Sequence, residues 1–354
     1  MPLHVHLTSV LAVAGCGVMV AVGCVKVTPD TPSHPRPVPL STNWNPSYVV
    51  TPPVEKTGEK TVRTREVPTP LETETAFAMQ LRLDRAGFSP GCIDGHWGPK
   101  SAAALAAWQE SKGLAATGEP DGEAVRSLGS IDGIWTGHVV TKDEHDALRP
   151  FPASWTERSR LDSMGFSTIR ETVAEAYHLS ETALVALNPG VPWPNPPAGT
   201  VLKVPDVRTR ALPAVQRIEI RIGAKTVRAY DGDGRMVAQF PCSIAANRAK
   251  RPIGQTLHVG VCADWPEYTF DPELFSDDPN AAGITKRLRI PPGPNNPVGL
   301  AWIGLDLPGY GIHGTPVPEK ISHTESHGCF RLTNWDAQRL LRAVRTGVPV
   351  EILP

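Results

Sequence analysis

The sequence has almost no net charge, few cysteines and no apolar run as long as an ordinary membrane span. Its 35 basic and 36 acidic residues leave a formal net charge of −1 at pH 7, which argues against nucleic acid as a partner. The apolar segment at residues 7–22 is short and is typical of a secretory signal. Only four of the 6 cysteines lie beyond residue 24, so at most one disulfide can form if one thiol stays free.

Proline, by contrast, is abundant. The chain has 37 prolines in 354 residues, about twice the usual share of ~5%. Ten of them fall within residues 25–70, among Thr, Ser, Lys and Glu, a composition that favours extended chain over a packed core. The total length predicts two or three domains. We therefore interpret residues 25–70 as a disordered spacer that leads into the folded part.

Cysteines end two apolar runs in the N-terminal segment. VAGC at residues 13–16 and AVGC at residues 21–24 both resemble the lipobox of bacterial lipoproteins, in which the cysteine becomes the lipidated first residue. Cys24 fits the polar boundary better, whereas Cys16 has the better residue three positions earlier, and no Lys or Arg precedes either of them. The resemblance implies a lipoprotein-type signal peptide at residues 1–24, with an uncleaved anchor as the alternative.

A histidine and a cysteine in two glycine-rich segments carry the clearest chemistry. Residues 311–315 read GIHGT and residues 326–332 read SHGCFRL. A thiol is a strong nucleophile only as thiolate, so Cys329 needs a neighbouring base, and His313 is the candidate. The single glycine before Cys329 allows a tight turn that aims backbone N–H groups at one point, as an oxyanion hole requires. The pattern predicts thiol acyl transfer, which needs no metal or other cofactor.

Two other interpretations of these residues stay open. His313, His323, His327 and Cys329 are residue types that bind zinc, although their spacings follow no zinc pattern and the glycines suit an oxyanion better. Cys329 could also be an inert buried thiol, although a loop of Ser, His and Gly is poor core material.

The two segments resemble the catalytic signature of the L,D-transpeptidases, the YkuD-type domains that remodel bacterial peptidoglycan. The resemblance extends upstream to the proline- and glycine-rich run at residues 291–303 and to PGYGIH at residues 308–313, and it covers roughly residues 214–354. It implies that Cys329 is the nucleophile and that His313 is the base, held in one tautomer by the backbone carbonyl of Gly314.

The same resemblance implies supporting roles for the neighbouring residues. The backbone of His327 and Gly328 would form the oxyanion hole, and Ser326 would orient the loop. Arg331 would hold a substrate carboxylate, with a structural ion pair as an equally supported alternative. The remaining candidate substrate contacts are Trp302, Tyr310 and Thr315.

Residues 71–129 predict three short helices around a turn-rich loop, GCIDGHWG at residues 91–98, with Pro99 starting the second helix. The order of these residues resembles the peptidoglycan-binding-1 module over its whole length. Trp108 is expected in the core, whereas Trp97 would either stack on a sugar or pack against the module.

Residues 130–160 are expected to be a connector, followed by a small unit at residues 161–206. Apolar residues at helical spacing predict two helices, with Ser180 between them, followed by a strand at residues 198–205. This order resembles a LysM module, which binds N-acetylglucosamine chains. The opening strand of that pattern is missing, so glycan binding and a purely structural role remain equally open.

Residues 212–354 alternate in a way that predicts a meander of short antiparallel strands and a β-sandwich-like catalytic domain. Asn334 is expected to cap a helix after Cys329. Cys242 and Cys262 lie on candidate neighbouring strands and are the favoured disulfide pair. The fold class is therefore multidomain α+β, with a three-helix module, a LysM-like βα unit and a mainly antiparallel catalytic domain.

These features predict an exported enzyme of the bacterial cell envelope whose partner is peptidoglycan and whose membrane contact is a lipid on Cys24 or Cys16. The resemblance implies that Cys329 attacks a tetrapeptide stem, releases D-alanine and passes the stem to an acceptor amine, which cross-links stems or attaches a protein to the wall. Two alternatives remain: trimming of stems as an L,D-carboxypeptidase, and a non-catalytic lipoprotein that binds the wall.

Overall fold

The computed structural model describes residues 72–129, 133–208, 210–275, 278–323 and 328–354. The expected signal peptide, the proline-rich spacer and the two candidate lipid sites Cys16 and Cys24 lie outside these residues. All the described residues belong to one contact unit of the chain. Within them, no helix is both long enough and apolar enough to cross a membrane.

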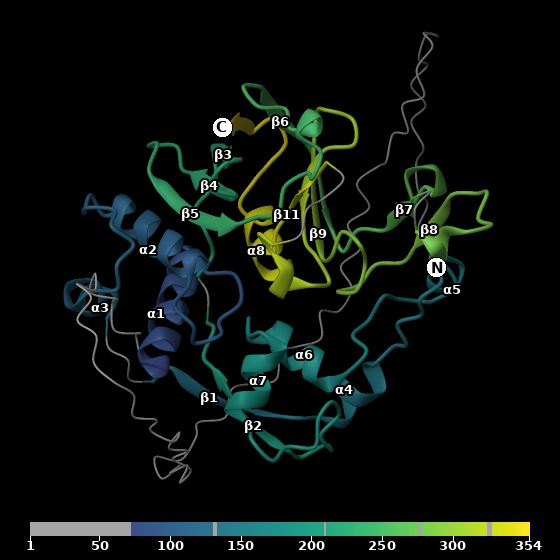
Figure 1. Ribbon diagram of the computed structural model, residues 1–354, viewed down its shortest axis with the longest axis horizontal. Coiled ribbons are helices and arrows are strands. Elements are labelled where there is room, and N and C mark those ends of the chain that lie inside the picture. Colours follow the sequence, from purple (N-terminus) through teal and green to yellow (C-terminus); the bar gives the residue numbers. More distant parts are fainter. Residues whose placement is uncertain (1–71, 130–132, 209, 276–277, 324–327) are drawn as a thin grey trace, which may run out of the picture. The chain divides into compact units, whose positions relative to one another are not determined.

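Three helices begin the described part of the chain, as the sequence predicted (Figure 1). They are α1 (Thr73–Ala86), α2 (Pro99–Ser111) and α3 (Gly122–Leu128). Pro99 occupies the first turn of α2, and the side chain of Asp121 caps α3 by accepting from two backbone N–H groups. The loop between α1 and α2 is fixed by Gln80, whose side chain bonds Asp94, Gly95, His96 and Ser101. Trp108 is buried, and Trp97 packs partly buried against the same core.

A two-stranded sheet and short helices form the middle part. Strand β1 (Trp135–Val139) pairs antiparallel with β2 (Val201–Pro205). Between them the chain forms α4 (Lys142–Ala147), α5 (Trp155–Arg158), α6 (Ile169–Ala176) and α7 (Glu181–Leu187). Ser180 caps α7 by accepting from the N–H of Ala183, as its residue type suggests. The first strand of this sheet therefore comes from the segment that was expected to be only a connector.

Eight strands form the sheet of the C-terminal part, in the order β11-β10-β9-β6-β12-β3-β4-β5. Their bounds are β3 (Arg217–Arg221), β4 (Thr226–Tyr230), β5 (Met236–Pro241), β6 (Thr256–Asp264), β9 (Ala301–Leu305), β10 (Gly311–His313), β11 (Phe330–Arg331) and β12 (Pro349–Leu353). An isolated bridge joins Ser243, just after β5, to Arg331 in β11. Because this bridge links the two ends of the strand order, the domain is one curled sheet and not the sandwich of two sheets that was expected.

Alternation along the strands places one set of side chains in the core of the curled sheet. Ile218 and Ile220 in β3 and Val227 and Ala229 in β4 point into one buried apolar cluster, while the residues between them face outward. Two of the strand pairs, β3 with β12 and β10 with β11, are parallel, and the others in the sheet are antiparallel. Helix α8 (Asn334–Leu341) covers one side through Ala337 and Leu340. Its cap is Thr333, whose hydroxyl accepts from Asp336 N–H, so the expectation that Asn334 caps the helix was wrong.

A separate ribbon of two short strands is inserted between β6 and β9. It pairs β7 (Tyr268–Phe270) with β8 (Leu288–Ile290). Its small apolar cluster includes Trp155 from α5, which stacks on Phe270 with ring centroids 4.3 Å apart. Four short 3₁₀ segments complete the described elements: η1 (Arg248–Lys250), η2 (Pro272–Phe275), η3 (Pro279–Ala281) and η4 (Pro318–Lys320).

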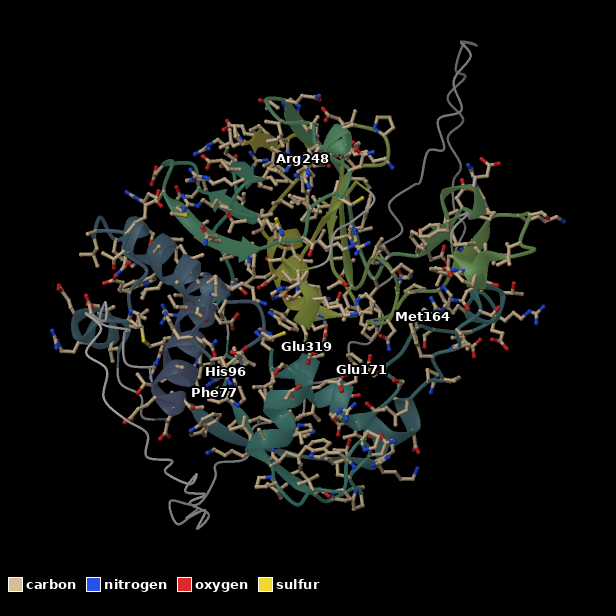
Figure 2. The ribbon with its side chains drawn as sticks, viewed as in Figure 1. Phe77, His96, Met164, Glu171, Arg248 and Glu319 are labelled. Atoms are coloured by element: carbon tan, nitrogen blue, oxygen red, sulfur yellow. The ribbon has the colours of Figure 1, made fainter. Side chains whose placement is uncertain are left out.

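Apolar side chains are shared across the boundaries between the parts. Tyr230 of β4 and Met236 of β5 belong to the same buried cluster as Leu83 and Trp108 of the helical module. Phe77 of α1 lies in the cluster of the middle part. Glu319 of η4 accepts a hydrogen bond from the N–H of Glu181 in α7 at 2.7 Å (Figure 2). The helical, middle and C-terminal parts are therefore packed against one another.

A cluster of buried polar side chains lies where all three parts meet. Asp84 of α1 and Asp336 of α8 are both fully buried. His178 of the middle part contacts Asp84 at 3.0 Å and stacks on Trp335, while Ser89 donates to Asp336 at 2.8 Å. We call Asp84, Ser89, His178 and Asp336 the polar junction. Burial is the main cause that raises the pKa of Asp336 to about 7, and the carboxylate of Asp84 raises it further.

The expected disulfide between Cys242 and Cys262 is not formed. Cys242 follows β5, whereas Cys262 lies on β6, and the strands β12, β3 and β4 separate the two in the sheet. Neighbouring strands lie about 4.8 Å apart, so this separation exceeds the ~7 Å that a disulfide can bridge. The two strands are not neighbours, and the prediction was wrong for that reason.

Candidate active site

The segments that carry His313 and Cys329 meet where β10 pairs with β11, at the end of the strand order. Strand β10 pairs with β11 in parallel, and His313 is in register with Arg331. Cys329 directly precedes β11 and lies two positions before Arg331. Because paired residues of neighbouring strands share a face, Arg331 and His313 lie on the same side of this edge, and Cys329 lies in the bend just before it. Sixteen residues of sequence separate the histidine from the cysteine, and strand pairing closes that gap.

His313 is buried, with 4% of its surface exposed, and its ring is held in one tautomer. The carbonyl oxygen of Gly314 lies 2.7 Å from Nδ1. A carbonyl can only accept, so Nδ1 carries the hydrogen and Nε2 of the neutral ring is left as an acceptor. Burial lowers the pKa of His313 to about 4, and Arg331 acts in the same direction. At neutral pH the ring is therefore an uncharged base.

Trp302 packs against the imidazole of His313, and two nearby glycines leave room for the groups around it. Trp302 lies opposite His313 in β9 and stacks on it with ring centroids 5.6 Å apart. A Cβ on Gly311 would lie 2.6 Å from the Trp302 ring. One on Gly314 would lie 2.1 Å from Oδ1 of Asn334. Both glycines are needed because a tryptophan and the start of α8 approach the backbone of β10 closely.

The thiol of Cys329 is partly buried and donates to the carbonyl oxygen of Gly309, with Sγ 3.3 Å away. Burial raises its pKa, while a backbone hydrogen bond from Gly311 and the charge of Arg331 lower it. Burial is the largest of these causes, so the pKa of Cys329 lies above its ordinary value and the thiol form is favoured.

Arg331 and Tyr268 complete the charged surroundings of the thiol. Arg331 is partly buried, and its positive charge acts on Cys329, His313 and Tyr268. Tyr268 belongs to β7, and burial raises its pKa to about 12. No pattern in the sequence indicated that Tyr268 belongs near this site, because the ribbon that carries it begins sixty-one residues before Cys329.

The other predicted residues have varied positions. The hydroxyl of Tyr310 donates to the carbonyl of Lys250 at 2.8 Å. Thr315 is buried, and its hydroxyl accepts from Val317 N–H at 3.3 Å. Gly328 is buried beside Cys329. Ser326 and His327 lie outside the described residues.

Asn334, which does not cap α8, instead connects this helix to the segment before β9. Its side chain accepts from Leu300 N–H at 3.1 Å and donates to the carbonyl of Pro294 at 3.2 Å. It therefore ties the start of α8 to the segment before β9, directly against Gly314. Across the described ranges, no group of three or more His, Cys, Asp or Glu side chains is arranged to hold a metal ion.

This edge and the curled sheet behind it lie in a segment that is similar to a known family of domains. Residues 215–352 match the family model of the L,D-transpeptidase catalytic domain, YkuD. Residues 74–128 match a model described as "Putative peptidoglycan binding domain". Two segments of the chain are therefore similar to these two families, and together they span most of the described residues.

The chain is also similar to individual proteins. "Putative L,D-transpeptidase YkuD" of Bacillus licheniformis is 28% identical over 185 residues, which are 52% of this chain and 93% of that protein. "Probable L,D-transpeptidase YbiS" of Escherichia coli K12 is 30% identical over 186 residues, which are 52% of this chain and 59% of that protein. The solved L,D-transpeptidase of Xylanimonas cellulosilytica (residues 123–326) is 16% identical, with 85% of this chain and all of that one covered and a TM-score of 0.34.

Proposed function

We propose that the protein is a cysteine-dependent L,D-transpeptidase that acts on the tetrapeptide stems of peptidoglycan through a thioester at Cys329. The observation that supports the proposal is the pairing of β10 with β11, in which His313 is in register with Arg331, two positions after Cys329, while burial lowers the pKa of His313. The matches to a catalytic domain and to a peptidoglycan-binding domain in one chain support peptidoglycan as the partner.

In the proposed reaction, Nε2 of His313 takes the thiol proton as Sγ of Cys329 attacks the carbonyl carbon of the donor stem. The C–N bond to the terminal D-alanine breaks, and the amine leaves with the proton that His313 held, so that a thioester remains. An acceptor amine then attacks the thioester, loses its proton to His313 and regenerates the thiol. The carbonyl oxygen becomes negative in both steps, and the backbone N–H groups at Gly328 and His327 are the proposed donors to it.

Surrounding residues give the proposed substrate its position. Arg331 supplies a positive charge beside the thiol that favours the thiolate and can meet a stem carboxylate. Trp302 holds the imidazole plane by stacking. Tyr310, Thr315 and Ser326 remain proposed members of the binding surface.

The remaining parts of the chain fit an envelope enzyme. We propose that residues 71–129 hold the enzyme on the wall and that the β1–α6–α7–β2 unit, which includes residues 161–206, is a LysM-like glycan-binding element. We also propose export through residues 1–24, a lipid on Cys24 or Cys16, and a spacer at residues 25–70. A tether of this kind would give the catalytic domain reach from a membrane to the wall.

The test is incubation of the protein with disaccharide tetrapeptide, followed by mass spectrometry of the products and of the intact protein. Wild type is compared with Cys329→Ala and with Cys262→Ala, a matched loss of a partly buried thiol in the same domain. Cross-linked dimers that vanish only in Cys329→Ala would support transpeptidation. Free D-alanine without dimers would instead support stem trimming, and the absence of both products and of any adduct would leave a wall-binding protein.

A further inference from the structure

A cavity of about 150 Å³ lies between the helical module and the catalytic domain. Its walls come from the first turn of α2, the turn that leads into β4, the end of β5 and the segment around Ser322. Neither Cys329 nor His313 lines it. The volume is enough for several water molecules, and therefore for one small ion.

Thr226 is the buried polar group that this cavity leaves unsatisfied. Val227 and Ala229 of β4 point into the core of the sheet, so Thr226 and Arg228 point outward, toward the helical module. Arg228 meets Glu110 of α2 in this direction at 3.0 Å. Thr226 is only 5% exposed, and its hydroxyl oxygen is buried with no hydrogen-bond partner. A buried hydroxyl without a partner in the protein can be satisfied by a bound group in the adjoining cavity.

Two lysines from opposite walls line the same cavity. Lys225 donates to the carbonyl of Ser322 at 2.9 Å, which uses one of its three N–H donors. Lys100 lies in the first turn of α2, and within the described parts of the chain it forms no ion pair. The N-cap of this thirteen-residue helix is Gly98, which supplies no capping side chain, so the first N–H groups of α2 add to the positive potential.

The other polar side chains in the wall are already satisfied. Ser89 donates to Asp336, Ser322 donates to the carbonyl of Cys242, and Gln239 both donates to Ala103 and accepts from Arg228. No aspartate or glutamate contributes to the lining. The groups that remain free in the cavity are therefore hydrogen-bond donors and positive charges, which is the lining that an oxyanion requires.

We propose that this cavity binds one oxyanion, held by Lys100, Lys225 and the hydroxyl of Thr226 at the seam between the helical module and the catalytic domain. The chemistry is shared by two sources, the free carboxylate at the end of a peptide and inorganic phosphate. The proposal rests on these side chains and does not depend on the proposed reaction at Cys329. Occupancy would also join the two parts, because one ligand is held by residues from each.

Isothermal titration calorimetry of the full chain tests the site with three probes. The probes are inorganic phosphate, an N-acetylated dipeptide with a free C-terminal carboxylate, and the same dipeptide as its carboxamide. The variants are Thr226→Val, which keeps the side-chain shape, Lys225→Met and Lys100→Met. Lys112→Met, at the exposed C-terminal end of α2, is the matched control. Unfolding midpoints without ligand check that each variant is folded.

We expect saturable binding that weakens with salt and weakens about tenfold in each lysine variant, because charge-assisted hydrogen bonds carry most of the affinity. Thr226→Val should weaken binding about threefold to tenfold, and Lys112→Met should leave it unchanged. Binding of the carboxylate peptide but not of its carboxamide identifies a peptide end as the source, whereas binding of phosphate alone identifies a free ion. The proposal is overturned if no probe saturates the protein, or if binding is the same in wild type and in all three cavity variants.

Discussion

The catalytic edge and the polar junction both bury ionisable side chains, but they do so with opposite results. At the edge, burial lowers the pKa of His313 to about 4, so the base is uncharged and keeps one nitrogen open. At the junction, burial raises the pKa of Asp336 to about 7, and the carboxyl group is engaged by Ser89. Loss of solvent therefore favours the neutral form of both side chains. At the edge the neutral group keeps a free acceptor nitrogen, whereas at the junction it is hydrogen-bonded between three parts of the chain.

The two regions also differ in what surrounds the buried groups. The edge is built around glycines, since Gly311 and Gly314 leave room for Trp302 and Asn334. The junction is built from side chains of α1, α8 and the middle part, which hydrogen-bond and stack on one another. A reactive site needs open backbone and a free acceptor, whereas a structural contact needs partners on every side.

The largest expected effect is a loss of activity when the proposed base at the edge is removed. His313→Gln keeps a side chain of similar size but removes the base, so we expect kcat/KM to fall by about 10²- to 10⁴-fold while the unfolding midpoint changes little. In wild type, the acid limb of kcat/KM should lie near the pKa of about 4 and not near 6.5, because His313 loses its function only when it is protonated. A pH profile of both proteins checks this, and an acid limb at 6.5 would contradict the assignment of the base.

The next effect tests the space that glycine provides at the edge. Gly314→Ala would place a methyl group 2.1 Å from Oδ1 of Asn334, so α8 or β10 must shift. We expect a loss of about 1–3 kcal/mol in the free energy of unfolding, together with reduced activity. Gly232→Ala is the matched control, since its methyl group would meet only ordinary contact at 3.7 Å. Equal effects of the two changes in urea denaturation would show that the space at Gly314 is not critical.

At the junction, the expected effect is on the pH dependence of stability. The folded state keeps a proton on Asp336 up to about pH 7, whereas the unfolded chain releases it near pH 4. Raising the pH through this window should therefore reduce the unfolding free energy by on the order of 2–4 kcal/mol in wild type. Asp336→Asn cannot titrate and should lack this fall.

Urea midpoints at several pH values, measured for wild type and Asp336→Asn, show how the pH dependence of stability differs between the two proteins. Contributions from other groups, including His313, are present in both and cancel in the comparison. Parallel curves for wild type and Asp336→Asn would mean that Asp336 titrates in the folded state much as it does in the unfolded chain.

The smallest expected effect concerns the thiols. Cys92 and Cys242 are buried, and burial raises both pKa values, that of Cys242 to about 12. Cys329 is partly exposed and lies next to Arg331. Iodoacetamide at neutral pH should therefore label Cys329 early and leave Cys92 and Cys242 unlabelled until the protein unfolds. Peptide mapping of the labelled protein checks the order, and early labelling of Cys242 would argue against the closed sheet.

Local patterns predicted the local structure well. Pro99, Ser180 and the alternation at residues 218–230 lie at the helix start, the cap and the strands that their residue types indicated. Chemistry and spacing also singled out His313 and Cys329 as a pair, which stays a prediction, and the pairing of β10 with β11 brings their segments together. Asn334 and Thr333 are both good capping residues, so sequence alone had no physical ground to choose between them.

What the sequence could not supply was the order of strands. Nothing local tells that β12 lies between β6 and β3, or that β1 pairs with β2 from sixty-six residues away. The disulfide prediction failed for this reason, since it assumed that strands close in sequence are neighbours. Tyr268 and the polar junction were missed because their partners come from distant segments, and such contacts depend on tertiary packing and not on pattern.

The position of β12 has a consequence for how the sheet forms during synthesis. Strands β3, β4 and β5 form one half of the sheet and β6, β9, β10 and β11 the other, and β12 hydrogen-bonds to both halves. Strand β12 is the last strand in the chain, so until it has been made the bridge between Ser243 and Arg331 remains as a link between the halves. The pairs of β12 with β3 and β6 are non-local contacts of the kind that form slowly and late. We therefore expect the complete sheet to form only after the strand at its centre has been synthesised.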